Sequence, residues 1–389
     1  MTEVVQAEVK APLLRRLRRI VVKIGSSVLA DERGLDRAQL TRLCDEIAEL
    51  HRRGLAVTVV TSGAIAAGRL RLGIAAPRSI PERQATAAVG QILLMAEYQR
   101  ALDERGVTVA QILVDAGDLA NRRRWLNAQH ALASLHQGRI LPIVNENDTV
   151  AVDELKFGDN DNLSALVASL VDADLLVILS DVAGLHDANP VAHPGARRIP
   201  IVTRVDAPLL DLASGGNALG TGGMRSKLQA ARKAAAAGIA TVIADGRAPG
   251  TLARVLDPDA DVGTLVLPVA DRLARRKHWI AHTVKPAGTL HCDEGAAAAI
   301  RRHGRSLLPS GITGVSGRFE AGDCVSLVGP DGAEFARGLA SYGAGEVARI
   351  AGRKSSDVET ILGYEMGDAV VHRNDLVVTA GDGSGDARR

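Results

Sequence analysis

The chain has 389 residues, of which 46% are hydrophobic, 24% are charged and only 2% are aromatic, and its formal net charge is +2. This length favours two domains over one core, and the small net charge argues against a polyelectrolyte as the main ligand. Three widely spaced cysteines without zinc-ligand or disulfide spacing, no signal peptide and no membrane-spanning apolar run together predict a cytoplasmic protein in a reducing compartment.

Short apolar runs alternate with amphipathic helical patterns through the first two thirds of the chain. Strands are predicted at 20–24, 56–61, 107–114, 140–144, 175–179 and 239–243, and helices near 36–53, 82–105 and 224–237. Strands interleaved with helices in this way predict an α/β three-layer sandwich with a mostly parallel central sheet. Such sheets bind ligands at the carboxyl ends of their strands, and the polar motifs of this sequence fall there.

The pattern changes near residue 271. A basic run within 271–277 is interpreted as a linker or a solvated helix, with a nucleic-acid contact as the less favoured alternative. Residues 278–380 combine short strands with glycine turns and predict a small β-rich domain. The main domain is then expected at 19–270, after a disordered or partly ordered tail at 1–18, and a disordered Gly/Asp-rich tail is expected at 381–389.

The first polar motif is Lys23, which lies inside an apolar strand and is followed by Gly25-Ser26-Ser27. A buried ammonium group is costly unless it meets an anion. A lysine that snorkels to the surface is the alternative interpretation. The glycine and the two hydroxyl residues favour a phosphate site, because backbone N–H groups can approach an anion closely there.

The second motif, 60–68, is a strand that runs through Ser62 into small residues and a helix. The start of such a helix can hold an anionic group through unpaired backbone donors and the helix dipole. Close packing of the helix on the strand is the less favoured alternative interpretation of the small residues.

Two further motifs are dense in carboxylates and amides. One is 145–148, which ends in Asp148, and the other is 157–162, which contains Asn160 and Asp161. Asx turns and a helix N-cap would explain one or two such residues. Two clusters of this density favour a functional site.

The last motifs belong to two further strand ends. The glycine-rich segment 220–227 enters an Ala-rich helix and ends in Lys227, but it is not a Walker A loop, because Ser226 stands where a glycine should precede the lysine. Ser180 and Asp181 end another strand, where a nucleotide base or ribose could be held. Two lysines, two glycine turns and two Asp/Asn clusters at the strand ends of one sheet indicate phosphoryl transfer between anions.

In this order, these motifs resemble those of the glutamate 5-kinase family within the amino acid kinase superfamily. The matching segments are VVKIGSS, TSGAIAAG, RQATAAVGQ, NENDTV, FGDNDNLSAL, SDVAGL and GTGGMRSKLQAA. The segment 124–128 also resembles the family, although Trp125 stands where Tyr is commoner. Segments 308–312 and 371–376 are similar to the PUA domain that many bacterial members carry.

The resemblance implies a reaction in which ATP and L-glutamate give γ-glutamyl phosphate and ADP, the first step of proline biosynthesis. It implies catalytic roles for Lys23, Lys227 and Asp161, with Asp161 orienting the two lysines. It implies that Ser62, Asp148 and Asn160 bind glutamate. The residues it implies around the nucleotide are Lys23, Ser180, Asp181, Thr221, Gly222, Gly223, Met224, Arg225, Ser226 and Lys227. Mg²⁺ is expected to accompany ATP, held mainly by phosphate oxygens and water, and no protein ligand is assigned to it.

Other activities are weighed against this one. Aspartate kinase is disfavoured because the C-terminal part does not resemble paired ACT domains, and acetylglutamate kinase because it usually lacks such an extension. RNA binding by the PUA-like domain is disfavoured because acidic residues offset the basic ones and the aromatic residues are scattered rather than forming a platform. A homo-oligomer, feedback inhibition by proline and transfer of the acyl phosphate to glutamyl phosphate reductase are expected from the family and the pathway.

Overall fold

The computed structural model describes residues 2–31, 34–150, 160–190, 192–213, 223–269 and 286–379. The chain divides into two compact units, residues 1–270 and 271–389. The linker predicted at 271–277 and the tail predicted at 381–389 lie outside the described residues.

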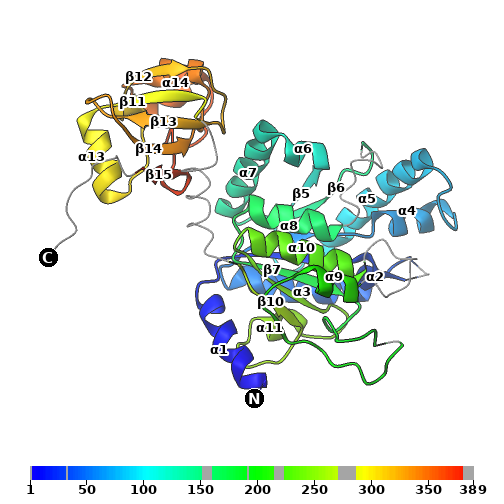
Figure 1. Ribbon diagram of the computed structural model, residues 1–389. Coiled ribbons are helices and arrows are strands. Elements are labelled where there is room, and N and C mark those ends of the chain that lie inside the picture. Colours follow the sequence, from blue (N-terminus) through cyan, green and yellow to red (C-terminus); the bar gives the residue numbers. More distant parts are fainter. Residues whose placement is uncertain are drawn as a thin grey trace. The chain divides into compact units, whose positions relative to one another are not determined.

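In the described part of the first unit, an eight-stranded sheet forms the centre (Figure 1). Across the sheet the strands are β5 (Val109–Val114), β6 (Leu141–Glu146), β4 (Ala56–Val60), β1 (Arg19–Ile24), β7 (Leu175–Ser180), β9 (Ala240–Asp245), β10 (Thr264–Val266) and β8 (Ile201–Val202). All pairs from β5 to β9 are parallel, whereas β10 runs antiparallel to β9. The predicted mostly parallel sheet is confirmed, and the carboxyl ends of its six parallel strands share one edge.

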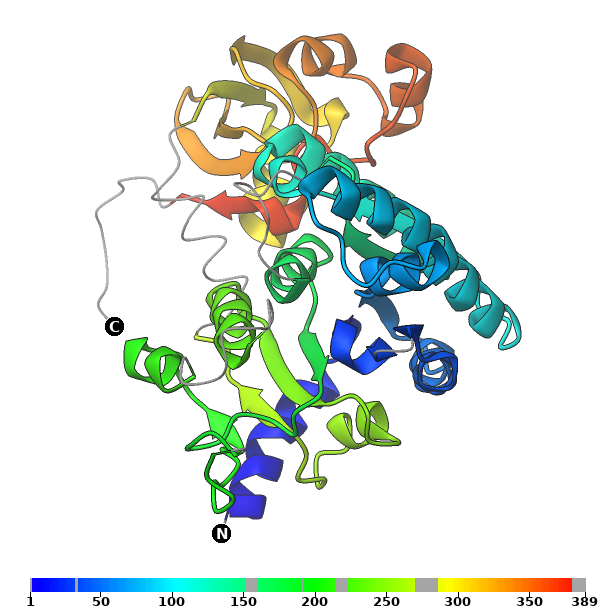
Figure 2. The ribbon, with the colours of Figure 1, turned by 90° about the vertical axis from the view of Figure 1, so that its right-hand side faces the viewer.

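Helices cover both faces of this sheet, as Figures 1 and 2 show. Apolar side chains of α3, α5 and α11 pack into the core on one face, and those of α7, α8 and α10 pack into the core on the other. A short β2 (Ala30–Asp31) pairs with β3 (Gly34–Leu35) beside the sheet. The helices of this unit in the described ranges are α1 (Thr2–Arg15), α2 (Ser26–Leu29), α3 (Arg37–Arg52), α4 (Ala64–Leu72), α5 (Ile80–Asp103), α6 (Ala116–Ala120), α7 (Arg122–Gln137), α8 (Asn160–Leu170), α9 (Ala207–Leu212), α10 (Met224–Ala236) and α11 (Thr251–Val255).

Side chains of β1 alternate between the two cores, as the period of two of a strand requires. Ile20, Val22 and Ile24 pack on the α3 side, whereas Val21 packs on the α8 side. Lys23 follows the same alternation and therefore faces α8 and α10. A strand that is otherwise apolar thus carries one ammonium group onto the face where the polar helix starts lie.

The segment 1–18 contains the helix α1, and a buried lysine anchors it. Lys10 is only 3% exposed. Its Nζ donates hydrogen bonds to the carbonyl oxygens of Arg254 at 3.2 Å, Asp257 at 2.6 Å and Ala260 at 3.1 Å. Burial lowers the pKa of Lys10, and the nearby carboxylate of Asp257 opposes that shift. The three carbonyl oxygens replace the water that the ammonium group loses, so these hydrogen bonds attach α1 to the segment 254–260.

The helices α4 and α5 lie side by side (Figures 1 and 2) and cross at two glycines. A Cβ atom at Gly68 would lie 1.9 Å from the carbonyl oxygen of Thr86, and one at Gly90 would lie 1.7 Å from that of Ala64. Only glycine allows two backbones to approach this closely. The crossing therefore fixes α4, and the turn before it, relative to α5.

The second unit has a five-stranded sheet in its described part. The order is β12 (Ile312–Gly317), β11 (Gly288–Cys292), β13 (Cys324–Val328), β14 (Glu334–Leu339) and β15 (Leu376–Val378), with β11 and β13 parallel and the other pairs antiparallel. The predicted β-rich C-terminal domain is confirmed. Its helices in the described residues are α13 (Glu294–His303), α14 (Ala344–Ile350) and α15 (Val358–Leu362), with 3₁₀ helices η2 (Pro309–Gly311), η3 (Ser355–Asp357) and η4 (Arg373–Asp375).

The aromatic side chains of the second unit mostly fill its core. Phe319, Phe335 and Tyr342 are buried. Tyr364, in contrast, is 41% exposed and its hydroxyl group donates to the carboxylate of Glu346. A phenol can lie at the surface because its polar end stays hydrated.

No helix within the described ranges is both long and apolar enough to cross a membrane.

Candidate active site

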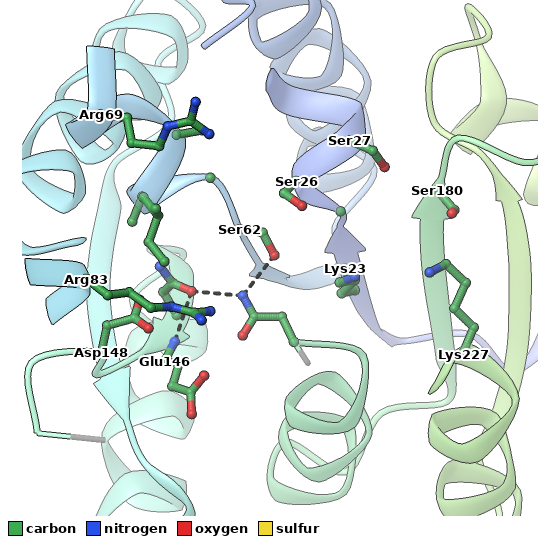
Figure 3. Close-up of a pocket in the computed structure, with 17 residues that line it drawn as sticks. Lys23, Ser26, Ser27, Ser62, Arg69, Arg83, Glu146, Asp148, Ser180 and Lys227 are labelled. Atoms are coloured by element: carbon green, nitrogen blue, oxygen red, sulfur yellow. Dashed lines mark hydrogen bonds between the residues drawn. The ribbon is translucent and has the colours of Figure 1, made fainter. Parts of the chain in front are cut away.

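A cavity of about 330 Å³ opens at the carboxyl edge of the first unit's sheet (Figure 3). It is built from the ends of β1, β4, β6 and β7 and from the starts of α2, α4, α8 and α10, as parallel strand order requires. The residues that line it are Lys23, Gly25, Ser26, Ser27, Ser62, Gly63, Ala64, Ile65, Ala66, Arg69, Arg83, Asn145, Glu146, Asp148, Asn160, Ser180 and Lys227.

Two lysines of this cavity share one carboxylate. Lys23 Nζ donates to Asp161 Oδ1, and Lys227 Nζ lies 3.3 Å from Asp161 Oδ2. The residues come from β1, α8 and α10, and their exposed fractions are 3% for Lys23, 0% for Asp161 and 5% for Lys227. Both lysines line the cavity, and ammonium groups at its wall favour the binding of an anion there.

Ser226 stabilises the same carboxylate. Its hydroxyl group donates to Asp161 Oδ2 at 2.8 Å and also lies 2.8 Å from the carbonyl oxygen of Gly223, at the start of α10. Asp161 Oδ2 therefore accepts from a hydroxyl group and an ammonium group of the same helix turn. Because Asp161 lies in the first turn of α8, the starts of α8 and α10 are held together at this point.

A network of amides lies between the lysines and the other end of the cavity. Asn160 Nδ2 donates to Ser62 Oγ at 2.8 Å, to the carbonyl oxygen of Thr61 at 2.7 Å and to Asn145 Oδ1 at 3.1 Å (Figure 3). Asn145 Nδ2 in turn donates to Gln91 Oε1 at 2.8 Å. The ends of β4, β6 and α8 are thus joined, and the oxygens of Ser62 and Asn160 stay at the cavity wall.

Two carboxylates line the same part of the cavity. Glu146 ends β6 and Asp148 lies in the following turn, and both are partly exposed. Carboxylates at this wall can bind a cationic group such as an ammonium ion.

Gly63 lines the cavity between β4 and α4 with a φ of 104°, a left-handed conformation that residues with a side chain rarely adopt.

The residues predicted to hold the nucleotide divide into three groups. Ser180, at the end of β7, is 2% exposed and lines the cavity with Lys227. A second group does not line the cavity and consists of Asp181, Gly223, Met224, Arg225 and Ser226. Asp181 is exposed and its carboxylate accepts a hydrogen bond from Ser180 Oγ at 3.1 Å. Met224 packs against the core, and the exposed side chain of Arg225 lies 4.0 Å from the carboxylate of Asp211. Thr221 and Gly222 lie outside the described residues.

Several lining residues were not named individually from the sequence. The arginines Arg69 and Arg83 lie on α4 and α5, and neither was selected as a site residue. Arg69 directly follows the small-residue motif 60–68, and Arg83 opens the segment RQATAAVGQ. Their positions next to two conspicuous motifs are the only sequence signal that could have found them.

Comparisons with known proteins agree with this architecture. The amino acid kinase family matches residues 18–245, and the PUA domain matches residues 288–362. The chain is 53% identical to a glutamate 5-kinase of Trichlorobacter lovleyi over 369 residues, and this alignment covers 94% of this chain and 98% of that protein. It is 48% identical to a glutamate 5-kinase of Pelobacter propionicus, over 94% of this chain and 99% of that one, and 48% identical to one of Geobacter sulfurreducens, over 95% and 100%. The chain therefore belongs to the amino acid kinase family and, within it, to the group of the glutamate 5-kinases.

Proposed function

We propose that this protein transfers the γ-phosphoryl group of ATP to the γ-carboxylate of L-glutamate, giving L-glutamyl 5-phosphate and ADP in the first step of proline biosynthesis. The observation that carries this proposal is the buried cluster of Lys23, Asp161 and Lys227 beside a cavity whose opposite wall bears amides and carboxylates. Relatives that match nearly the full chain are named glutamate 5-kinase.

The two lysines reduce the electrostatic repulsion between the two anionic reactants. A carboxylate and a phosphate oxygen about 4 Å apart repel each other by roughly 4 kcal/mol per pair of charges at an effective dielectric constant of about 20. Two ammonium groups at the point of contact offset that repulsion, and they stabilise the negative charge on the equatorial oxygens of the transferring phosphoryl group. In this proposal Asp161 holds both lysines in place and does not touch the substrate.

No general base is required. A γ-carboxylate with an ordinary pKa near ~4.3 is already ionised at neutral pH and can attack the phosphorus atom directly. The protein therefore has to position two anions and shield their charges, and it does not have to remove a proton. A site built from lysines, amides and hydroxyl groups suits that task.

The amides and carboxylates of the opposite wall are proposed to bind the amino acid substrate. Asp148 would accept the α-ammonium group, and Ser62 and Asn160 would hydrogen-bond the rest of the glutamate. Because these residues come from the ends of β4 and β6 and the start of α8, the sheet edge itself would set the distance between the ammonium group and the reacting carboxylate.

The nucleotide is proposed to approach from the β7 and α10 side, near Ser180, Asp181 and the segment 221–227. Within the described residues, no group of three or more His, Cys, Asp or Glu side chains could bind a metal ion by itself. Mg²⁺ is proposed to accompany ATP, held mainly by phosphate oxygens and water, where it would neutralise phosphate charge.

Hydroxamate formation in the presence of hydroxylamine tests the reaction. L-Glutamate, L-aspartate and N-acetyl-L-glutamate are compared with and without ATP, and the expected result is an ATP-dependent product from L-glutamate far above the others. Preference for either other acid, or no product from glutamate, would overturn the proposal.

Asp148→Ala tests the assignment of the ammonium site. We expect KM for glutamate to rise about 10- to 100-fold, the range for losing a charged hydrogen bond, with little change in KM for ATP. Asp103→Ala removes an exposed carboxylate at the end of α5, away from the cavity, and serves as the control. An unchanged KM for glutamate in the Asp148 variant would contradict the assignment.

The other expected partners remain part of the proposal. A homo-oligomer is supported by apolar side chains exposed on neighbouring helices, among them Leu70 at 63% on α4 and Ile92 at 73% on α5. We also propose feedback inhibition by proline, transfer of the acyl phosphate to glutamyl phosphate reductase, and action in the cytoplasm without RNA binding by the second unit. Glutamate saturation with and without proline tests the feedback: no change in apparent affinity would reject it.

A further inference from the structure

The mechanism above leaves two arginines of the cavity without a role. Arg69 lies in α4 and Arg83 in the first turns of α5, and both line the cavity. In Figure 3 they lie on one side of it and Lys227 lies on the other, with Ser62 and Lys23 between them. The cavity therefore has positively charged groups at two separate ends.

Within the described residues, no ion pair or side-chain hydrogen bond joins Arg69 or Arg83 to another residue, although Glu146 and Asp148 line the same cavity. Arg69 is partly buried, and its Nε is buried without a hydrogen-bond acceptor. A desolvated N–H of a cation that has no acceptor is unfavourable, so the arrangement favours an anionic acceptor from outside the chain.

The helix crossing fixes the backbone positions of the two arginines relative to each other, and the exposed side chain of Arg83 extends from there to the cavity. Arg69 directly follows Gly68, and Arg83 lies one turn before Thr86, whose carbonyl oxygen would be 1.9 Å from a Cβ at Gly68. Backbones in direct contact cannot slide without breaking that packing. Arg69 and Arg83 are thus positioned by rigid elements, which a selective site requires.

The charges along the cavity match those of an acidic amino acid. In Figure 3, Lys23 and Lys227 lie toward one end of the cavity, and the arginines lie toward the other end together with the carboxylates of Glu146 and Asp148. Glutamate carries a γ-carboxylate, an α-ammonium group and an α-carboxylate. The lysines and Asp148 already account for the first two of these charges in the proposed function, and the α-carboxylate has no cationic partner.

We infer that Arg69 and Arg83 bind the α-carboxylate of the amino acid substrate and so determine which of its two carboxylates meets the phosphoryl group. This inference rests on the proposed function. Guanidinium groups suit the task because their planar N–H forks match a carboxylate better than an ammonium group does. A carboxylate held at this end is kept away from the lysines, so phosphorylation falls on the γ-carboxylate.

The test compares glutamate with its α-amide, in which a carboxamide replaces the α-carboxylate and the γ-carboxylate is kept. We expect the wild type to prefer glutamate at least about 100-fold in kcat/KM. In Arg69→Gln and Arg83→Gln, kcat/KM for glutamate should fall about 10- to 100-fold, mainly through KM, whereas the value for the α-amide should change less than about threefold. KM for ATP should stay the same in both variants.

Arg71→Gln is the matched control, because it removes an exposed positive charge from the same helix and does not line the cavity. It should leave the preference for glutamate unchanged. Arg69→Lys keeps the positive charge but loses the planar pair of N–H donors. It should therefore retain part of the preference for glutamate that Arg69→Gln loses. Equal losses for glutamate and the α-amide would show that the arginines only support the fold, and an unchanged preference would also overturn the inference.

Calorimetric titration of the unmodified protein with the same two compounds, without ATP, separates this inference from the proposed reaction. Tighter binding of glutamate than of the α-amide, abolished by Arg69→Gln, would support the arginine site even if no phosphorylated product formed. Equal binding of the two compounds to the wild type would refute the arginine site even if glutamate were phosphorylated.

Discussion

Replacing Asp161 by Asn removes a negative charge that the two lysines share and keeps the shape of the side chain. At 3.3 Å from Lys227 Nζ, the carboxylate contributes about 5 kcal/mol of gross attraction at an effective dielectric constant of about 20. Removing one partner of a buried ion pair costs about 3–5 kcal/mol. Both ammonium groups line a cavity and can move toward water, so we expect the low end, about 3 kcal/mol.

Urea unfolding of the first unit, followed through the reactivity of Cys44, measures this loss. Ser226→Ala is the control: it removes a 2.8 Å hydrogen bond to the same carboxylate but keeps the charge, and should cost about 1.5 kcal/mol. Asp161→Asn should also lower kcat at least about 100-fold, because neither lysine would be held at the phosphoryl group. If the free energy of unfolding of Asp161→Asn stayed within about 1 kcal/mol of the wild type and its kcat within about tenfold, the cluster would have neither a stabilising nor a catalytic role.

Three further predictions concern other parts of the first unit. Lys227→Ala should lower kcat about 100-fold or more while KM for glutamate changes only a few-fold, and near-normal turnover in a steady-state assay would remove its proposed role. Gly90→Ala places a Cβ 1.7 Å from the carbonyl oxygen of Ala64, so thermal unfolding should show a loss of about 3 kcal/mol or more, and an unchanged melting temperature would contradict the close crossing. Burial raises the pKa of Cys44 to about 12, so at pH 8 its thiol should resist alkylation in the folded protein and react quickly in denaturant, whereas rapid labelling of the folded protein would refute this burial.

The fold and the location of the site could be predicted from the sequence because both follow from local patterns. The strand at 20–24 and the strand at 175–179 are apolar runs that only a buried parallel sheet explains, and parallel strands bring their carboxyl ends to one edge. Lys23, Ser62 and Asp148 were therefore expected together, and the cavity lining contains all three.

The contacts within the site could not be predicted in the same way. Lys23 and Asp161 are separated by 138 positions in the chain, and their meeting depends on how α8 packs over β1. Arg69 and Arg83 resemble the solvated charges that most surface helices carry, and only the crossing of α4 and α5 brings them to the cavity. The anchoring of α1 likewise depends on Lys10 reaching carbonyl oxygens about 250 residues away, which no local pattern records.

The way Asp161 is held explains why one carboxylate can set the geometry of the two ammonium groups that we propose to be catalytic. A long lysine side chain is flexible, and two such side chains on separate elements would vary independently in their spacing. Here each Nζ is paired with a different oxygen of one planar carboxylate, so the positions of Lys23 and Lys227 are coupled. Because Asp161 is fully buried and Ser226 restrains its second oxygen, the spacing of the ammonium groups follows from the packing of β1, α8 and α10. In the proposed reaction, the packed core of the first unit would then help determine where the phosphoryl group is transferred.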